Sequence, residues 1–69
     1  MDIKVGDIIE YYGRGVVYIY KIKPDYQKEE DDKVYFKILK SYLLSYPVGY
    51  KDWSRRQFIE NYSDFVHIE

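Results

Sequence analysis

Few residues in this chain are suited to catalysis. His67 is the single histidine, and a histidine with no spaced partner is more typical of a strand residue than of a general base. A serine nucleophile needs an orienting base and an oxyanion site. Neither is indicated by the spacing of the serines, which are Ser41, Ser45, Ser54 and Ser63. We therefore expect no catalytic residue and no enzyme activity.

The chain also lacks the usual means of holding a metal or a cofactor. It has no cysteine, which excludes disulfides and thiolate metal sites. The acidic segment 24–32 lacks the glycine and the alternating oxygen ligands of a calcium loop, and no phosphate-binding glycine loop is present. We expect no metal and no cofactor. The missing cysteines fit a reducing, cytoplasmic compartment.

Aromatic residues give a stronger indication of function. Tyrosine accounts for 10 of the 69 residues, whereas alanine, threonine and cysteine are absent. A tyrosine has an apolar ring and a polar tip, so it suits half-buried and contact positions. Trp53 follows Tyr46 and Tyr50, and together these rings would form a contact surface if they were exposed. The alternative is that Trp53 packs on the next helix and fills the mouth of a small barrel.

Two strand tyrosines can also be interpreted either as contact residues or as structural ones. Tyr18 and Tyr20 lie on the side of their strand opposite to Ile19. A strand of a small barrel has one core face, so these phenols are expected outside. They form a binding face or a homodimer interface, or they fill outer positions that threonine would otherwise take.

The three arginines are candidate binding residues. Arg55 and Arg56 fall in the first turn of the predicted helix, where positive charge opposes the helix dipole. Such an unfavourable placement can mark a partner site, although Arg56 and Glu60 also form an i,i+4 pair. Arg14 lies in the turn Gly13–Gly15. Ordinary solvated arginines are the alternative interpretation.

These side chains must be positioned by short strands. Residues 7–12 and 16–23 read as a hairpin across Gly13–Gly15, because glycine reaches positive φ without steric cost. Pro24 ends the second strand, and residues 24–32 are predicted to be a solvated, mobile acidic loop. Residues 33–40 form a third strand with Val34, Phe36 and Ile38 on one face. Residues 41–46 are predicted to be a fourth strand or a continuation of the third strand past a bulge. Pro47 and Gly49 end this segment.

One short helix is predicted over residues 55–62. Ser54 and Gln57 have the spacing of a capping box, and Trp53 and Phe58 have that of a hydrophobic staple. Phe58 and Ile59 are expected to dock the helix, and Phe58 and Tyr62 lie one turn apart. Residues 64–68 form a last strand. The sequence thus predicts a single domain, 1–69, that is mainly β: a small five-stranded antiparallel barrel with one short helix before the last strand.

The opening of the chain resembles known barrels. In the SH3-like KOW, Tudor and CarD-type polymerase-interacting domains, a Val-Gly-Asp strand with two hydrophobic residues precedes a glycine turn and a G-x-V-x-x-I strand. Here Val5-Gly6-Asp7-Ile8-Ile9 and Gly15-Val16-Val17-Tyr18-Ile19 take these places. The resemblance covers residues 3–22 and implies an SH3-like fold more than a function. Trp53 to Tyr62 is similar to the ending of many small phage-encoded proteins.

Two kinds of function follow from these residues. The preferred one is a non-enzymatic protein-interaction module, such as a phage accessory protein that binds a host or phage protein. The alternative is a nucleic-acid-binding barrel that stacks bases on Tyr18, Tyr20 or Trp53 and holds phosphates with arginines. It requires the arginines and the aromatic residues to lie on one face and the acidic 29–32 run to face away. The formal net charge of −1 argues against binding by bulk charge. Homodimerisation is a third possibility, and no apolar run reaches the roughly 20 residues of a membrane span.

Overall fold

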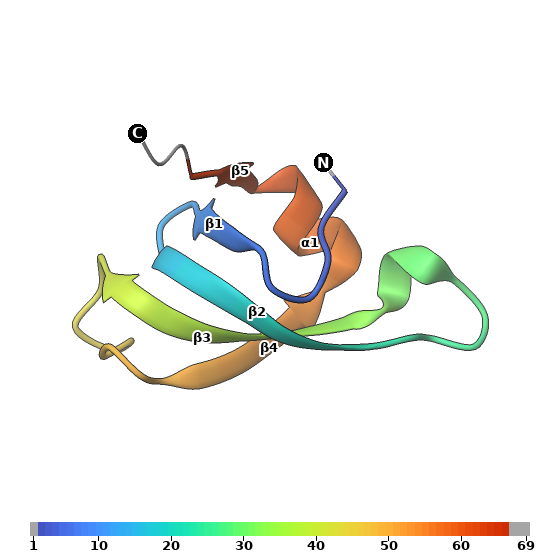
Figure 1. Ribbon diagram of the computed structural model, residues 1–69, viewed down its shortest axis with the longest axis horizontal. Coiled ribbons are helices and arrows are strands. Elements are labelled where there is room, and N and C mark those ends of the chain that lie inside the picture. Colours follow the sequence, from blue (N-terminus) through green and yellow to red (C-terminus); the bar gives the residue numbers. More distant parts are fainter. Residues whose placement is uncertain (1, 67–69) are drawn as a thin grey trace.

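The computed structural model describes residues 2–66 and is mainly β. Five antiparallel strands form one sheet in the order β4-β3-β2-β1-β5 (Figure 1). The strands are β1 (Ile8–Tyr11), β2 (Gly15–Lys23), β3 (Lys33–Ser41), β4 (Lys51–Arg55) and β5 (Ser63–Phe65). A short helix, α1 (Arg56–Asn61), precedes β5, and a 3-10 turn, η1 (Glu29–Asp31), precedes β3. The predicted fold class is confirmed in these terms.

The predicted hairpin joins β1 to β2. Ile9 pairs with Val17 and Tyr11 pairs with Gly15 across it. Gly15 has a φ of +136°, and a Cβ at this position would lie 1.9 Å from the carbonyl oxygen of Lys40 on β3. The second glycine of the turn is therefore required both for its backbone conformation and for the close approach of β3.

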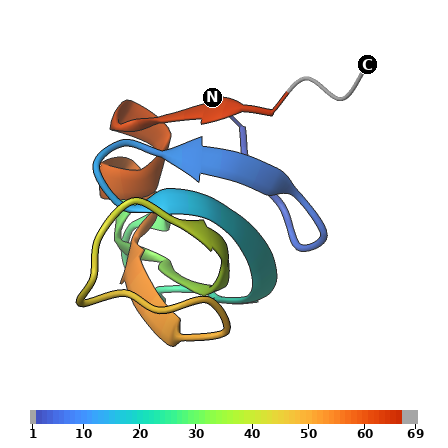
Figure 2. The same cartoon turned by 90° about the vertical axis from the view of Figure 1, so that its left-hand side faces the viewer.

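The sheet is strongly curved. Seen from one end, its strands wrap towards α1 (Figure 2). The pairing of β2 with β3 shifts register twice, between Val16 and Val17 and between Ile19 and Lys21. Each irregularity adds a residue to one strand, which bends the strand and increases its twist. These two bulges allow β2 and β3 to fold around a core.

The position of the fourth strand was predicted wrongly. Residues 41–46 were expected to form it or to continue the third strand past a bulge, but Ser41 ends β3 and β4 lies at Lys51–Arg55. The Ser41 hydroxyl donates to the carbonyl oxygen of Leu43 at 2.6 Å and accepts from the Leu43 N–H, which turns the chain at once. Pairing of Lys37 with Lys51 then places β4 along the first half of β3.

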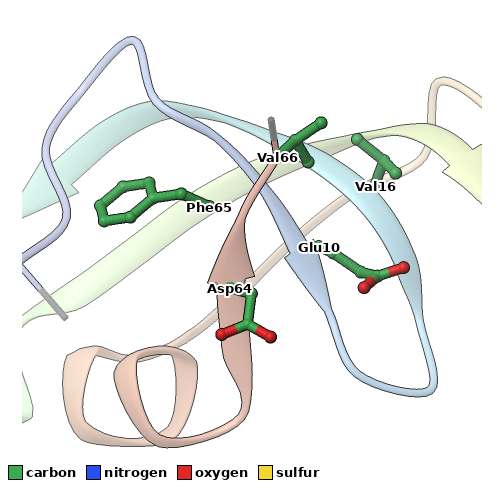
Figure 3. Close-up of a pocket in the computed structure, with 5 residues that line it drawn as sticks. All are labelled: Glu10, Val16, Asp64, Phe65 and Val66. Atoms are coloured by element: carbon green, nitrogen blue, oxygen red, sulfur yellow. The ribbon is translucent and has the colours of Figure 1, made fainter. Parts of the chain in front are cut away.

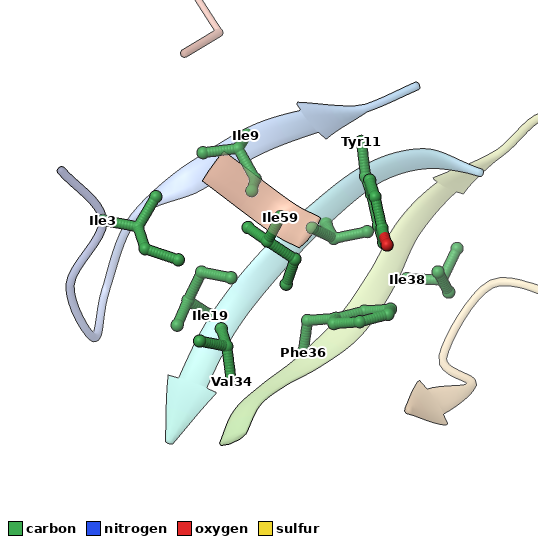
Figure 4. Close-up of a cluster of buried hydrophobic side chains, with 9 residues drawn as sticks. Ile3, Ile9, Tyr11, Ile19, Val34, Phe36, Ile38 and Ile59 are labelled. Atoms are coloured by element: carbon green, nitrogen blue, oxygen red, sulfur yellow. The ribbon is translucent and has the colours of Figure 1, made fainter. Parts of the chain in front are cut away.

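The core lies on the concave face of the sheet (Figure 4). Val34, Phe36 and Ile38 of β3 are fully buried, as their alternation predicted. Tyr11 packs edge-on against Phe36, with ring centroids 5.6 Å apart. Ile59 is the one buried residue of α1, and its burial contributes on the order of 1.5–3 kcal/mol to holding the helix on the sheet.

The predicted helix cap and staple are wrong. Helix α1 begins at Arg56 with Arg55 as its N-cap, and no side chain caps it. The Ser54 hydroxyl instead bonds the Tyr11 hydroxyl at 3.2 Å, because Ser54 belongs to β4. Phe58 is 53% exposed and so is not a docking residue, although it does stack on Tyr62 at 5.8 Å.

The last strand, β5, pairs with β1, with Ile9 opposite Phe65. It was predicted over 64–68 and occupies Ser63–Phe65, while residues 67 and 68 of that prediction, with His67, lie outside the described part of the chain. Within residues 2–66, no helix is long and apolar enough to cross a membrane.

Candidate functional site

The convex face of β2, β3 and β4 carries three rows of side chains across the sheet. Antiparallel partners place their side chains on the same face, so the pairing defines each row. The first row is Tyr18, Lys37 and Lys51; the second is Lys21, Tyr35 and Trp53; the third is Lys23, Lys33 and Arg55. Tyr20 is the extra residue of the bulge beside the second row. We call these ten residues the basic–aromatic face.

Cations and rings are interleaved on the basic–aromatic face. The Lys33 ammonium lies 4.9 Å from the centre of the Trp53 ring, and that of Lys21 lies 5.3 Å from the Tyr35 ring. The Lys51 ammonium lies 5.4 Å from the Tyr20 ring. Trp53 is 42% exposed and Tyr18 is 36% exposed, so these rings keep accessible surface. A cation over a ring is held near it by the ring's quadrupole.

Acidic side chains are absent from the basic–aromatic face. Asp52 is the one acid on the three strands; it pairs with the core residue Phe36 and therefore points away from this face. Its carboxylate accepts the Tyr46 hydroxyl at 3.3 Å. Among residues 2–66, none of the five lysines of the face forms an ion pair. Arg55 reaches Asp31 at 3.9 Å, but both side chains are substantially exposed, and such a pair contributes little.

Tyr46, Tyr50 and Arg14 gather elsewhere. Tyr46 packs edge-on to Tyr50, with centroids 5.4 Å apart, and its ring also contacts the core. The Arg14 guanidinium lies 4.8 Å from the Tyr46 ring and donates a hydrogen bond to its hydroxyl. These three residues join the β1–β2 turn to the β3–β4 loop. The eight predicted binding residues are thus divided among regions rather than gathered on one surface.

Arg56 is a partly buried structural cation. Its side chain is 12% exposed, and its Nε donates to the Asp32 carboxylate at 3.1 Å. Its Nη1 donates to the carbonyl oxygen of Ile3 at 3.1 Å and reaches Glu60 at 3.5 Å. The expectation that Arg56 is a surface binding residue is therefore not supported by its placement. Its charge is neutralised inside the fold.

The acidic segment is partly buried beside Arg56, whereas all of it was predicted to be a solvated, mobile loop. Asp32 is 5% exposed, and its carboxylate also accepts the backbone N–H of Asp25 at 2.7 Å. Its carbonyl oxygen accepts the backbone N–H of Arg56 at 2.8 Å. A buried carboxylate needs a cation and hydrogen bonds, and the burial of Asp32 beside Arg56 follows from that need. Glu29 and Glu30 remain exposed, as expected of a solvated loop.

One hollow is acidic and is lined by residues of β1, β2 and β5 and by Val66 (Figure 3). Glu10 and Asp64 project their carboxylates from neighbouring strands, beside Val16, Phe65 and Val66. Asp64 accepts the Tyr12 hydroxyl and Glu10 accepts the Tyr42 hydroxyl. These hydrogen bonds raise the pKa of both phenols above the ordinary tyrosine value. The hollow is therefore unsuited to an anionic ligand.

Ser41, Ser54 and Ser63 are engaged in the fold or buried rather than arranged for chemistry. Ser54 is bonded to Tyr11, and Ser41 is engaged in its turn. The Ser63 hydroxyl is buried and has no hydrogen-bond partner within the part of the chain that the structure describes. Among residues 2–66, no group of three or more histidine, cysteine, aspartate or glutamate side chains is arranged to hold a metal ion.

Sequence reasoning missed most of the cations on the basic–aromatic face. Lys21, Lys23, Lys33 and Lys37 were readable as outward positions of two predicted strands. The missing information was the pairing of β3 with β4, which brings Lys51 and Trp53 beside them. Comparison with protein-family models, with curated proteins and with solved structures finds no match to this chain.

Proposed function

We propose that the basic–aromatic face binds single-stranded nucleic acid. The observation that carries this proposal is the set of three cross-strand rows, which combines four aromatic rings with six cations and no acid. Proteins that hold single strands use the same two elements: cations that follow the backbone and rings on which bases stack.

Charge distribution supports the proposal more than net charge does. The formal net charge is −1, yet the acids of residues 2–66 lie outside the three rows. They occur before β1 at Asp2 and Asp7, in segment 25–32, on β1, α1 and β5, and beneath β4 at Asp52. The five lysines of the face have no acidic partner among the described residues. Their positive potential is therefore available to phosphates, whose neutralisation releases counterions.

The rings favour a single strand over a duplex. Tyr35 and Trp53 are paired across neighbouring strands, and Tyr20 and Tyr35 have centroids 6.3 Å apart. Tyr20 and Tyr35 are half-buried, and Tyr18 and Trp53 are exposed; a sheet that carries accessible rings can stack two or three unpaired bases. Bases inside a duplex are already stacked and cannot reach it.

The site differs from the one expected at the sequence level. Tyr18, Tyr20 and Trp53 remain the proposed stacking residues, and Arg55 remains a phosphate-binding residue. On this face five lysines, rather than Arg14 and Arg56, are the other proposed phosphate-binding residues. Arg56 is neutralised by Asp32 and Glu60. The acidic run is not wholly turned away, since Asp31 touches Arg55 at one end of the third row.

A titration tests the proposed function. Fluorescently labelled single-stranded and duplex oligonucleotides of equal length are added to the protein at ~50 mM salt, where electrostatic affinity is strong. We expect saturable binding that is tighter for the single strand. Absence of binding to either form would overturn the proposal, and tighter binding of the duplex would show that the rings are not stacking residues.

We also propose that the curved sheet is an SH3-like barrel. The opening pattern of Val5 to Ile9 leads into β1, and the glycine turn leads into β2, as in the domains that the sequence resembles. The helix before the last strand and the pairing of β1 with both β2 and β5 support the same assignment. The phage origin stays a prediction that rests on the sequence alone.

A protein partner is the second candidate, supported by a different surface. The β3–β4 loop exposes three aliphatic residues: Leu43, Leu44 and Val48. Leu44 is fully exposed, and exposed apolar residues that are grouped in one loop can mark a protein contact site. A pull-down with the wild-type chain and with Leu44→Ser/Val48→Ser tests this proposal. A partner held equally by both would place its contact elsewhere, and the absence of any stoichiometric partner would remove the candidate.

Self-association stays a third proposal. Strands β4 and β5 are the two edges of the sheet, and an edge strand can pair with a second chain. Size-exclusion chromatography with light scattering decides it, because a monomer at high protein concentration excludes a stable homodimer.

A further inference from the structure

A second hollow adjoins the basic–aromatic face at the edge of β4. It measures about 260 Å³ and is lined by Tyr11, Arg14, Trp53, Ser54, Arg55 and Phe58. Trp53 and Arg55 belong both to this hollow and to the face. A nucleic-acid strand that crosses the basic–aromatic face over Trp53 therefore reaches the hollow while it stays in contact with the protein.

The lining of this hollow suits a nucleotide. It contains two arginines and no acid, in contrast to the hollow that holds Glu10 and Asp64. Phe58 is 53% exposed and offers an apolar ring on one wall. Arg14 is held in place by the rings of Tyr11 and Tyr46, at 5.6 Å and 4.8 Å. A guanidinium held in advance loses less side-chain freedom when it binds a phosphate.

We propose that this hollow takes one further nucleotide of the strand bound on the basic–aromatic face. Its base stacks on Phe58, and its phosphate lies between Arg14 and Arg55. This proposal rests on the proposed function. It also defines the path of the bound nucleic acid, which leaves the basic–aromatic face across the edge of β4.

The test compares a tetranucleotide with an octanucleotide, both single-stranded, by fluorescence anisotropy. The wild-type chain is expected to bind the octanucleotide more tightly by a factor of roughly ten, since one stacked base is worth about 1–3 kcal/mol. Phe58→Ser should remove most of that gain and leave the affinity for the tetranucleotide unchanged. Phe65→Ser is the matched control, because Phe65 is also an exposed phenylalanine, at 45%, but lies on β5 outside the hollow.

The outcomes separate the two proposals. If the wild-type chain binds no oligonucleotide, the proposed function fails and the second site fails with it. If the tetranucleotide binds but Phe58→Ser keeps the full octanucleotide gain, the face binds nucleic acid and the hollow does not. Equal loss of the gain in Phe58→Ser and Phe65→Ser would also overturn the proposal, because it would trace the effect to the loss of any exposed ring rather than to the hollow.

Discussion

Two neighbouring regions of this chain use positive charge in opposite ways. Arg56 lies in the buried region, where Asp32, Glu60 and the Ile3 carbonyl oxygen surround its guanidinium. Arg55, the preceding residue, lies on the basic–aromatic face with five lysines that have no ion pair among residues 2–66. One peptide bond separates a cation that holds the fold together from a cation that is available to a ligand.

The difference follows from burial. A buried cation is tolerated only where anions and hydrogen bonds replace its water. An exposed lysine keeps its water and needs no partner. Charge that is neutralised within the fold cannot attract a ligand, so the two arginines have different consequences when they are changed. The predictions below test that separation.

The largest effect is expected on stability, from Arg56→Ala. Removal of the guanidinium leaves the Asp32 carboxylate, which is 5% exposed, without a cation. Breaking such a pair costs about 3–5 kcal/mol of the free energy of unfolding. Urea denaturation measures this loss. Arg55→Ala is the control and should change the free energy of unfolding by less than about 1 kcal/mol; an equal loss in both variants would contradict the comparison.

The next effect is expected on binding, from Lys37→Glu/Lys51→Glu. These lysines are paired in the first row of the face, and their reversal should weaken single-strand binding roughly a hundredfold at ~50 mM salt. The control Lys4→Glu/Lys28→Glu changes net charge equally at exposed positions outside the face. Fluorescence anisotropy compares the two. Equal weakening by both pairs would mean that net charge, and not the face, determines affinity.

A smaller effect is expected from Trp53→Ala. Loss of one stacking ring should weaken binding by about 1–3 kcal/mol without changing the salt dependence, because no charge is removed. Tyr26→Ala is the control, since Tyr26 is 92% exposed and lies outside the face. Anisotropy titrations at several salt concentrations measure both quantities. If Trp53→Ala binds as the wild type does, the rings are not stacking residues.

The smallest effect concerns Asp25 in the acidic segment. The backbone N–H groups of Lys28 and Gln27 donate to its carboxylate and lower its pKa in the folded chain. Since the folded pKa lies below the unfolded one, the carboxylate stabilises the fold above the unfolded pKa, and this contribution is lost as pH falls through the folded pKa. Asp25→Asn should therefore lower the melting temperature slightly down to about pH 4, and the difference should shrink below that. A difference that grows on acidification would contradict this sign.

Strand alternation predicted the core well. Val34, Phe36 and Ile38 are buried because a period of two is a local property of an extended chain. The hairpin was also predictable, since Gly13 and Gly15 supply the φ values that the turn requires. In β3 and in the β1–β2 hairpin, the structure depends on residues that are close in the sequence, so the sequence pattern was sufficient to predict it.

Long-range pairing could not be predicted in the same way. Ser54 has the sequence pattern of a helix cap, yet it lies in β4 and bonds Tyr11, which is 43 positions away. The sequence alone suggests that Arg56 is a surface residue, because it does not show that Asp32 lies beside it in the fold. The candidate site depends on such contacts, because Trp53 joins the lysines only through the pairing of β3 with β4. The sequence therefore indicated the rings and Arg55, but not the five lysines or the face that they share.

Amide chemical shifts test the central claim most directly. A ¹⁵N-labelled sample is titrated with a short single-stranded oligonucleotide at ~50 mM salt, and the perturbed amides are assigned. The largest changes are expected in residues 18–23, 33–37 and 51–55, with little change in the β3–β4 loop or around Glu10 and Asp64. Changes centred on Leu43 to Val48, or no changes at saturating oligonucleotide, would contradict the assignment of the basic–aromatic face as the binding surface.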